Sequence, residues 1–157
     1  MAPKILVAMD DSENAMRAVT HVARTFSRDV AVTLFSVLPD TATLCDLNSP
    51  ELTPLFRSQQ ASFCQLEDKK RMLVTEACEK ARQTLIEAGF PPDRVEVRTE
   101  PRKKGVARDI AALAALEGFE LIVLGKHGMT GIKDFFMGSV PQKVTQLAKD
   151  TSVLIAS

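Results

Sequence analysis

Short apolar runs alternate along this chain with longer segments whose apolar residues recur at helical spacing. The runs typical of strands are 4–9, 29–38, 94–99, 120–124 and 152–156. The segments with helical spacing are 12–27, 66–88, 106–114 and 140–148. Strands that alternate with helices predict a parallel sheet with right-handed connections and helices on both faces, which is a doubly wound α/β architecture.

The pattern is lost between about residues 39 and 62, where threonine, asparagine, serine and proline interrupt the apolar spacing. We expect a long irregular loop there, and we expect it to be the most mobile part of the chain. The helix that follows is predicted to stop at Gly89, because Pro91 cannot continue it. The charged alternation of 94–99 predicts a half-exposed strand at or near an edge of the sheet.

The chain has 157 residues, the usual size of one domain, and we expect 1–157 to form a single folding unit. Twenty basic residues offset twenty acidic ones, so the net charge favours neither nucleic acid nor an anionic membrane as a partner. The apolar run 4–9 is too short for a secretory leader, and no run is long enough to cross a bilayer. These features predict a cytoplasmic protein.

Three cysteines, Cys45, Cys64 and Cys78, are spread along the middle of the chain. An odd number without closely spaced pairs argues against a disulfide framework and against a zinc site in a reducing cytosol. We therefore expect all three to be ordinary thiols.

Two glycine clusters follow the apolar run 120–124 and precede the last predicted helix. They consist of Gly125, Gly128 and Gly131, and of the pair Gly138-Ser139. Glycine lets the backbone approach a ligand closely, and the N–H groups at a helix start favour phosphate. In a doubly wound sheet a ligand lies beyond the carboxyl ends of the strands, where the strand order reverses. A 3-2-1-4-5 order would bring the loops after the first and fourth strands together.

The motif formed by Gly125, Gly128, a nine-residue spacer and Gly138-Ser139 resembles the nucleotide motif of the universal stress protein family, in particular of its ATP-binding branch. The segment 7–13, Val-Ala-Met-Asp-Asp-Ser-Glu, is similar to that family's first strand and acidic turn. The resemblance covers essentially the whole chain apart from 39–62. It implies a five-stranded parallel sheet in the order 3-2-1-4-5, with helices on both faces, of the adenine nucleotide alpha hydrolase-like class.

The resemblance also implies an ATP site. Asp10 would face the adenosine near the base, and the backbone of Val37 would bond the adenine edge. Ala8 and Met9 would line the same pocket. The ribose and phosphates would be wrapped by the backbone of Gly125, Lys126, His127, Gly128, Gly138, Ser139 and Val140. Any Mg²⁺ or Mn²⁺ would be held mainly by the phosphates of the nucleotide, and we assign no metal ligands and no catalytic residues to the protein.

Elementary chemistry supports these roles independently of the family. A carboxylate accepts hydrogen bonds from hydroxyl or amino groups, and clustered amides hold phosphate. Competing roles remain open for several residues: Asp10 also suits a turn or cap, and Ser12 suits a helix cap better than a ligand. His21 is expected to be structural or to face solvent, and His127 to shape its loop rather than act as a base.

Two residues depart from the pattern of the family. Asp11 stands where relatives commonly have glycine, and its carboxylate would either repel phosphate or help to hold a metal. Pro141 stands where ATP-binding relatives often have serine or threonine, and proline has no N–H to offer a phosphate oxygen. Because proline is favourable in the first turn of a helix, the helix should survive, but we expect a weaker or differently placed triphosphate.

Three functions are compatible with the sequence. The first is a cytoplasmic ATP-binding stress-response or regulatory protein with slow hydrolysis at most, because no phosphoryl-transfer motif is present. The second is an enzyme that hydrolyses ATP or transfers AMP, although the signatures of such enzymes are missing after the first strand. The third is a ligand-free interaction module, which Asp11 and Pro141 favour.

The final apolar run, 152–156, would leave an unpaired edge if it is the last strand of the sheet. A second copy of the chain pairing along this edge would satisfy its hydrogen bonds. The family resemblance likewise implies a homodimer through this strand.

Overall fold

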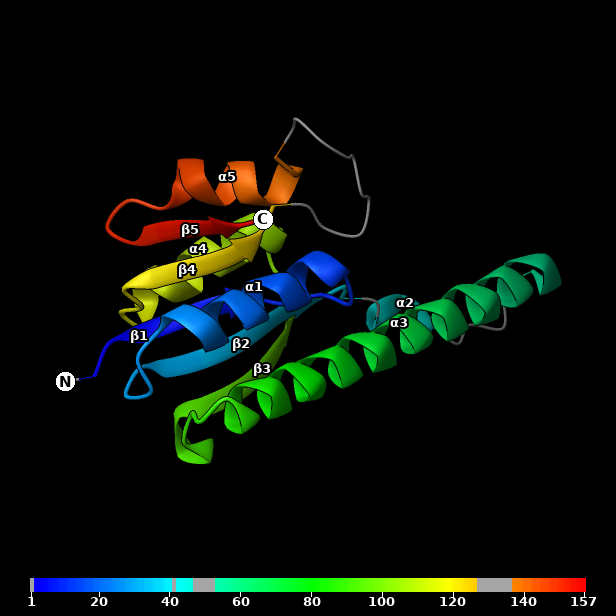
Figure 1. Cartoon of the computed structure of the whole chain (residues 1–157). Coiled ribbons are helices and arrows are strands. Elements are labelled where there is room, and N and C mark those ends of the chain that lie inside the picture. The colour runs from blue at the N-terminus through cyan, green and yellow to red at the C-terminus, as the bar shows by residue number, and fades with distance from the viewer. Residues whose placement is uncertain (1, 41, 47–52, 127–136) are drawn as a thin grey trace.

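The computed structural model describes residues 2–40, 42–46, 53–126 and 137–157. These residues contain a five-stranded parallel sheet in the order β3-β2-β1-β4-β5, with helices on both faces (Figure 1). The order predicted from the sequence is therefore confirmed. It makes β1 and β4 neighbours in the middle of the sheet, with Ile5 opposite Leu121 and Val7 opposite Val123.

Each strand corresponds to one of the predicted runs. The strands are β1 (Lys4–Ala8), β2 (Ala31–Leu38), β3 (Val95–Pro101), β4 (Leu121–Gly125) and β5 (Ser152–Ala156). The three central strands are buried on both faces, which explains their continuous apolar runs. β3 and β5 form the two edges of the sheet. The charged alternation of β3 and the predicted final place of β5 in the sheet order had indicated these positions.

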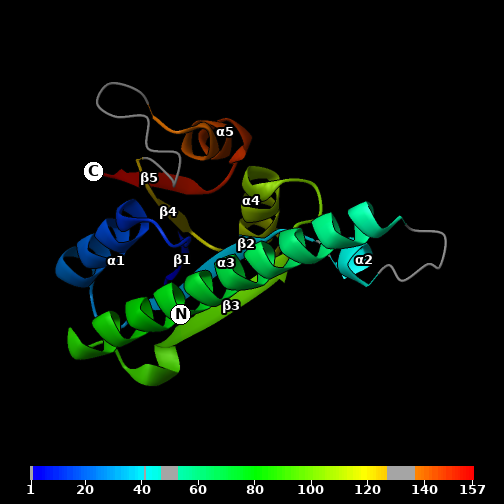
Figure 2. The ribbon, with the colours of Figure 1, turned by 90° about the vertical axis from the view of Figure 1, so that its right-hand side faces the viewer.

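Two layers of helices cover the sheet (Figure 2). One face packs against α1 (Glu13–Thr25) and the carboxyl-terminal part of α3 (Pro54–Glu87). The other face packs against α4 (Val106–Leu116) and α5 (Ser139–Leu147). Two short elements complete the description, namely α2 (Ala42–Cys45) and a 3₁₀ turn, η1 (Pro92–Arg94).

The long helix α3 begins at Pro54, about eight residues before the end of the predicted irregular loop at 62. Thr53 caps it, because its hydroxyl accepts a hydrogen bond from the N–H of Phe56 at 3.2 Å, and Pro54 is favourable in the first turn. The early part of the helix lies beyond the sheet (Figure 1), so packing on the sheet does not determine which of its positions are apolar. Despite this length, the described residues include no helix with the apolar character that a membrane span needs.

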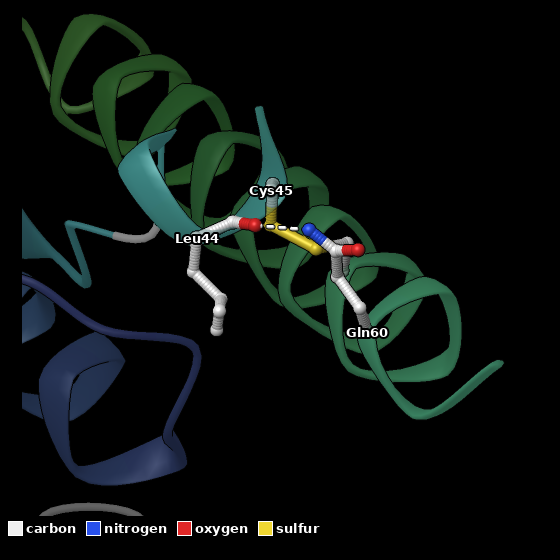
Figure 3. The surroundings of a disulfide bond; sticks show 4 residues. Leu44, Cys45 and Gln60 are labelled. Atoms are coloured by element: carbon white, nitrogen blue, oxygen red, sulfur yellow. Dashed lines mark hydrogen bonds between the residues drawn. A yellow bond between two sulfur atoms is a disulfide. The ribbon is translucent and has the colours of Figure 1, made fainter. Parts of the chain in front are cut away.

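Cys45 and Cys64 form a disulfide bond between α2 and α3 (Figure 3), so the expectation of three free thiols was wrong. The sequence separation of 19 residues between the two cysteines gave no hint of this bond, because it depends on the packing of α2 against α3. The side chain of Gln60 also donates a hydrogen bond to the carbonyl of Leu44 beside the disulfide. Cys78 is a buried free thiol, as expected.

Candidate functional site

A cavity of about 320 Å³ lies at the carboxyl ends of β1, β2 and β4, where the strand order reverses. Its volume falls at the lower end of the range for small-molecule sites. The predicted site residues that line it are Ala8, Met9, Asp10, Val37, Gly125, Gly138, Ser139 and Val140. The cavity does not include Lys126, and the predicted residues His127 and Gly128 lie outside the described residues.

The turn after β1 fixes Asp10 at the edge of the cavity. The N–H of Met9 donates to the carbonyl of Phe35 at 2.7 Å, which extends the pairing of β1 with β2 by one residue. Asp10 Oδ1 then accepts from the N–H of Ser12 at 2.8 Å, and Ser12 Oγ accepts from the N–H of Ala15 at 3.2 Å. Asp10 therefore stabilises the turn while it lines the cavity, and Ser12 is the helix cap that the sequence predicted.

Val37 presents backbone groups to the cavity because β2 continues after β1 has ended. Alternate residues of a strand direct their N–H and C=O groups to opposite neighbours. The carbonyl of Phe35 bonds toward β1, whereas the carbonyl of Leu38 accepts from the N–H of Arg102 at 2.7 Å on the β3 side. The backbone groups of Val37 therefore point to the β1 side, past the last residue of β1, and offer an adjacent donor and acceptor at the cavity wall.

The first residues of α5 line the cavity and are linked to the ends of β4 and β5 by hydrogen bonds of Lys126. The N–H of Lys126 donates to the carbonyl of Ala156 at 2.9 Å, and the carbonyl of Lys126 accepts from the N–H of Gly138 at 2.8 Å. These bonds engage two of the amides that the sequence assigned to phosphate. The next two residues, Ser139 and Val140, open the helix, where an N–H has no carbonyl of its own helix to bind. They are therefore the amides best placed to receive an anion.

Pro141 is buried in the first turn of α5 and lines the cavity. The helix tolerates it as expected, and its carbonyl accepts a hydrogen bond from the Thr145 hydroxyl at 2.8 Å. Because proline carries no N–H, the anion-binding face of this helix start is limited to the amides of Ser139 and Val140.

Two cations and one carboxylate line the cavity among the described residues, namely Lys70, Arg102 and Asp10. The backbone bond from Arg102 to Leu38 anchors the residue at the end of β3. This excess of positive charge favours an anionic ligand. Arg102 lines the cavity, whereas the carboxylate of Asp109 accepts from the N–H groups of Lys103 and Lys104.

Apolar side chains complete the cavity and come from both faces of the sheet. Phe35, Leu124, Val106 and Ile110 contribute to one wall from β2, β4 and α4. Val74 contributes from α3, together with Lys70 one helical turn before it. Sequence reasoning missed these residues. The helical spacing of Lys70 and Val74 places them on one face of α3, but nothing in the sequence indicated that this face reaches the cavity.

Asp11 does not line this cavity. It lines a separate hollow of about 430 Å³ between α1 and α3, and its buried Oδ1 has no hydrogen-bond partner among the described residues. No group of three histidine, cysteine, aspartate or glutamate side chains converges within the described ranges. Of the two roles predicted for Asp11, neither repulsion of phosphate nor metal binding has support at the main cavity.

A doubly wound parallel sheet with a hollow at its topological switch point is the architecture of α/β proteins that bind a ligand at the carboxyl ends of their strands. The model of the universal stress protein family matches residues 1–156. The chain belongs to this family, as the motifs at 7–13 and 125–139 predicted.

Two curated relatives match this chain over most of their length. Universal stress protein YxiE of Bacillus subtilis is 25% identical over 151 residues, which cover 94% of this chain and 95% of the relative. Universal stress protein MJ0577 of Methanocaldococcus jannaschii is 27% identical over 148 residues, which cover 92% of this chain and 88% of the relative.

Solved structures share the fold. Universal stress protein UspA from Lactobacillus plantarum matches with a TM-score of 0.73 at 22% identity, covering 99% of this chain and 97% of that protein. A universal stress protein from Archaeoglobus fulgidus in complex with dAMP matches with a TM-score of 0.64 at 19% identity, covering 100% and 98%. A family member from Arabidopsis thaliana with AMP bound matches with a TM-score of 0.59 at 14% identity, covering 99% and 92%.

Proposed function

We propose that this protein binds an adenine nucleotide, ATP in the cell, in the cavity at the carboxyl ends of β1 and β4. The observation that carries the proposal is the backbone of Val37, which offers a donor and an acceptor side by side beyond the end of β1, opposite the start of α5. Complexes of family members with dAMP and AMP support the same ligand class.

The base would lie against the apolar wall and bond to Val37. The edge of adenine carries an acceptor nitrogen next to an amino donor, which complements one N–H and one C=O of a single residue. Asp10 would accept from a hydroxyl or amino group of the adenosine, and Ala8 and Met9 would line the same end. Since the cavity holds about 320 Å³, it suits the nucleoside part, and the phosphates would lie toward its opening.

The phosphates would bind at the start of α5. The N–H groups of Ser139 and Val140 and the positive end of the helix attract an anion, and Arg102 adds charge. Gly125, Lys126, His127, Gly128 and Gly138 are assigned to the same loop by the family motif. Mg²⁺ or Mn²⁺ would be held mainly by the phosphates of the nucleotide.

The biological role that we propose is regulation during stress in the cytoplasm, with binding as the function and slow hydrolysis at most. A homodimer would form through residues 152–156. β5 lies at the edge of the sheet, and an unpaired apolar edge favours pairing with a second copy.

Calorimetric titration with AMP, ATP and inosine monophosphate tests the assignment of Val37. Inosine reverses the donor and acceptor at the relevant edge, so we expect it to bind about tenfold more weakly than AMP, a difference of about 1.4 kcal/mol. Val37→Pro removes the N–H without removing a sheet hydrogen bond and should weaken AMP about tenfold. Val37→Ala retains the N–H and serves as the matched control.

Equal binding of AMP and inosine monophosphate by the native protein would contradict this placement of the base. Failure of any adenine nucleotide to bind would favour the ligand-free interaction module, which the missing N–H of Pro141 supports. Identification of the small molecule released when the purified protein is denatured separates these cases without a variant, and we expect an adenine nucleotide.

A further inference from the structure

The first half of α3 carries an exposed apolar stripe. Phe56, Phe63, Leu66 and Leu73 are 38%, 39%, 67% and 42% exposed, although each is large and apolar. They follow one another at intervals of seven, three and seven residues, which are the a and d positions of a heptad repeat. Gln59 and Lys70 occupy the two remaining positions of the same stripe. Such a seam is typical of a helix that packs against another helix.

The stripe is turned away from α2 and belongs to the part of α3 that precedes the residues buried against the sheet. Cys64, which is bonded to Cys45 of α2, is roughly 130° around the helix from the middle of the stripe at about 100° per residue. Burial against the sheet starts only at Val74. The early part of α3 extends beyond the ends of the strands (Figure 1), and α2 is held on another face of the helix.

The stripe is complementary to itself when two copies run antiparallel. In an antiparallel pair of helices each a residue faces a d residue of the other copy. If Phe63 of one copy faces Leu66 of the other, each layer pairs two apolar residues or two polar residues. The layers are then Phe56 with Leu73, Gln59 with Lys70, and Phe63 with Leu66, each formed twice.

Charge argues against the alternatives. A parallel pair would place Lys70 opposite Lys70 in the seam, and a shift of the antiparallel pair by one heptad would place Lys70 opposite Leu66. Both leave the ammonium group of Lys70 without a hydrogen-bond acceptor in the seam, whereas in the favoured register it faces the amide oxygen of Gln59. In the favoured register the flanking positions bring Glu67 near Gln60 and Lys69 near Ser62, so no like charges meet.

We propose that residues 56–73 of α3 form an antiparallel coiled coil with the same residues of a second copy of this chain. The overlap is about 27 Å long at 1.5 Å per residue. Since sheet packing begins at Val74, the globular part of each copy lies beyond the first turn of the other copy's α3. The contact uses a different surface from β5 and requires no nucleotide.

Sedimentation velocity over a range of concentrations tests the pairing with single variants. Leu66→Glu and Phe63→Lys should each abolish one association step, which halves the limiting mass. Met72→Glu is the matched control, because Met72 is 63% exposed on the same helix but lies on its opposite side. An equimolar mixture of the two charged variants should regain the mass. In the mixed pair the introduced lysine of one variant would face the introduced glutamate of the other, while the unchanged Leu66 and Phe63 form the second layer.

Each result bears on the proposal directly. Recovery in the mixture, with neither variant associating alone, supports the antiparallel register. An unchanged mass in both single variants overturns the proposal and leaves any dimer to β5. Loss in each variant without recovery in the mixture also overturns it, because the layers would not be those described. Circular dichroism should show the same helix content in all variants, since the substituted side chains are exposed.

Discussion

Gly125 at the end of β4 lies directly against the backbone of Asn14 in α1. A Cβ atom at Gly125 would be 2.6 Å from the carbonyl oxygen of Asn14 and 2.7 Å from its carbonyl carbon, closer than such atoms approach in proteins. The obstacle is backbone, so rotation of a side chain cannot relieve it. Gly125 is thus required for the packing of α1 on β4, whatever its role toward a ligand.

Replacement of Gly125 by alanine should therefore destabilise the fold. We expect Gly125→Ala to lower the free energy of unfolding by roughly 1–3 kcal/mol, measured by urea denaturation, because the helix must shift away from the strand. Gly118→Asn provides the contrast. Gly118 has a φ of 71°, which asparagine tolerates, and open space around its Cβ position. Equal losses from both substitutions would show that the contact with Asn14 is unimportant.

Asp10 has a structural and a proposed binding role that substitution can separate. Asp10→Asn keeps an oxygen to accept from the N–H of Ser12, so stability should change by less than about 0.5 kcal/mol, whereas Asp10→Ala should cost about 1 kcal/mol. Both variants lose the carboxylate and should bind AMP about tenfold more weakly. Thermal unfolding and calorimetry measure the two effects. Unaltered AMP binding in Asp10→Asn would show that Asp10 stabilises the turn and does not bind the nucleotide.

Arg102 should contribute to the binding of phosphate rather than of the base. We expect Arg102→Ala to weaken ATP and AMP about tenfold, because it removes a charge-assisted interaction, and to leave adenosine unaffected. The loss should shrink at high ionic strength. Lys103→Ala is the control, since only the backbone of Lys103 bonds to Asp109. A loss that is equal for adenosine and AMP would contradict the assignment to phosphate.

The thiol content tests the disulfide and the burial of Cys78. We expect no rapid reaction of the native protein with a thiol reagent at about pH 8, one thiol per chain in denaturant, and three after reduction. Burial raises the pKa of the Cys78 thiol above 9.0, and the nearby Ser36 hydroxyl partly opposes this. The neutral thiol is therefore favoured in the folded state. Its contribution to stability is present below pH 9.0 and is lost as the pH rises through the raised value. Three thiols in denaturant without reduction would refute the disulfide.

The sequence predicted those parts of the fold in which burial dictates residue type. β1, β2 and β4 are covered on both faces, so their runs had to be apolar, and the capping roles of Ser12 and Gly89 follow from local backbone chemistry. The start of α3 lacked this constraint. Only Val74, Cys78, Ala81 and Leu85 of that helix are buried, so the spacing that burial against the sheet imposes is confined to its second half.

The candidate site was predictable where backbone geometry determines it and not where distant segments converge. The glycine and serine residues that open α5 and the residues that follow β1 could be placed from their motif. Lys70, by contrast, reaches the cavity from a helix that starts far from either loop, and Cys64 meets Cys45 because α2 lies against that helix. Contacts of this kind depend on tertiary packing, which no local pattern encodes.

One residue, Lys126, connects β5 and α5 beyond the end of β4. Its N–H is bonded to the last residue of β5 and its carbonyl to the residue that caps α5. Movement of the first turn of α5 therefore reaches the outer margin of the sheet through two hydrogen bonds in series, without rearrangement of the core. Binding of an anion at the first turn of α5 and pairing of a second copy along β5 would therefore be coupled through Lys126.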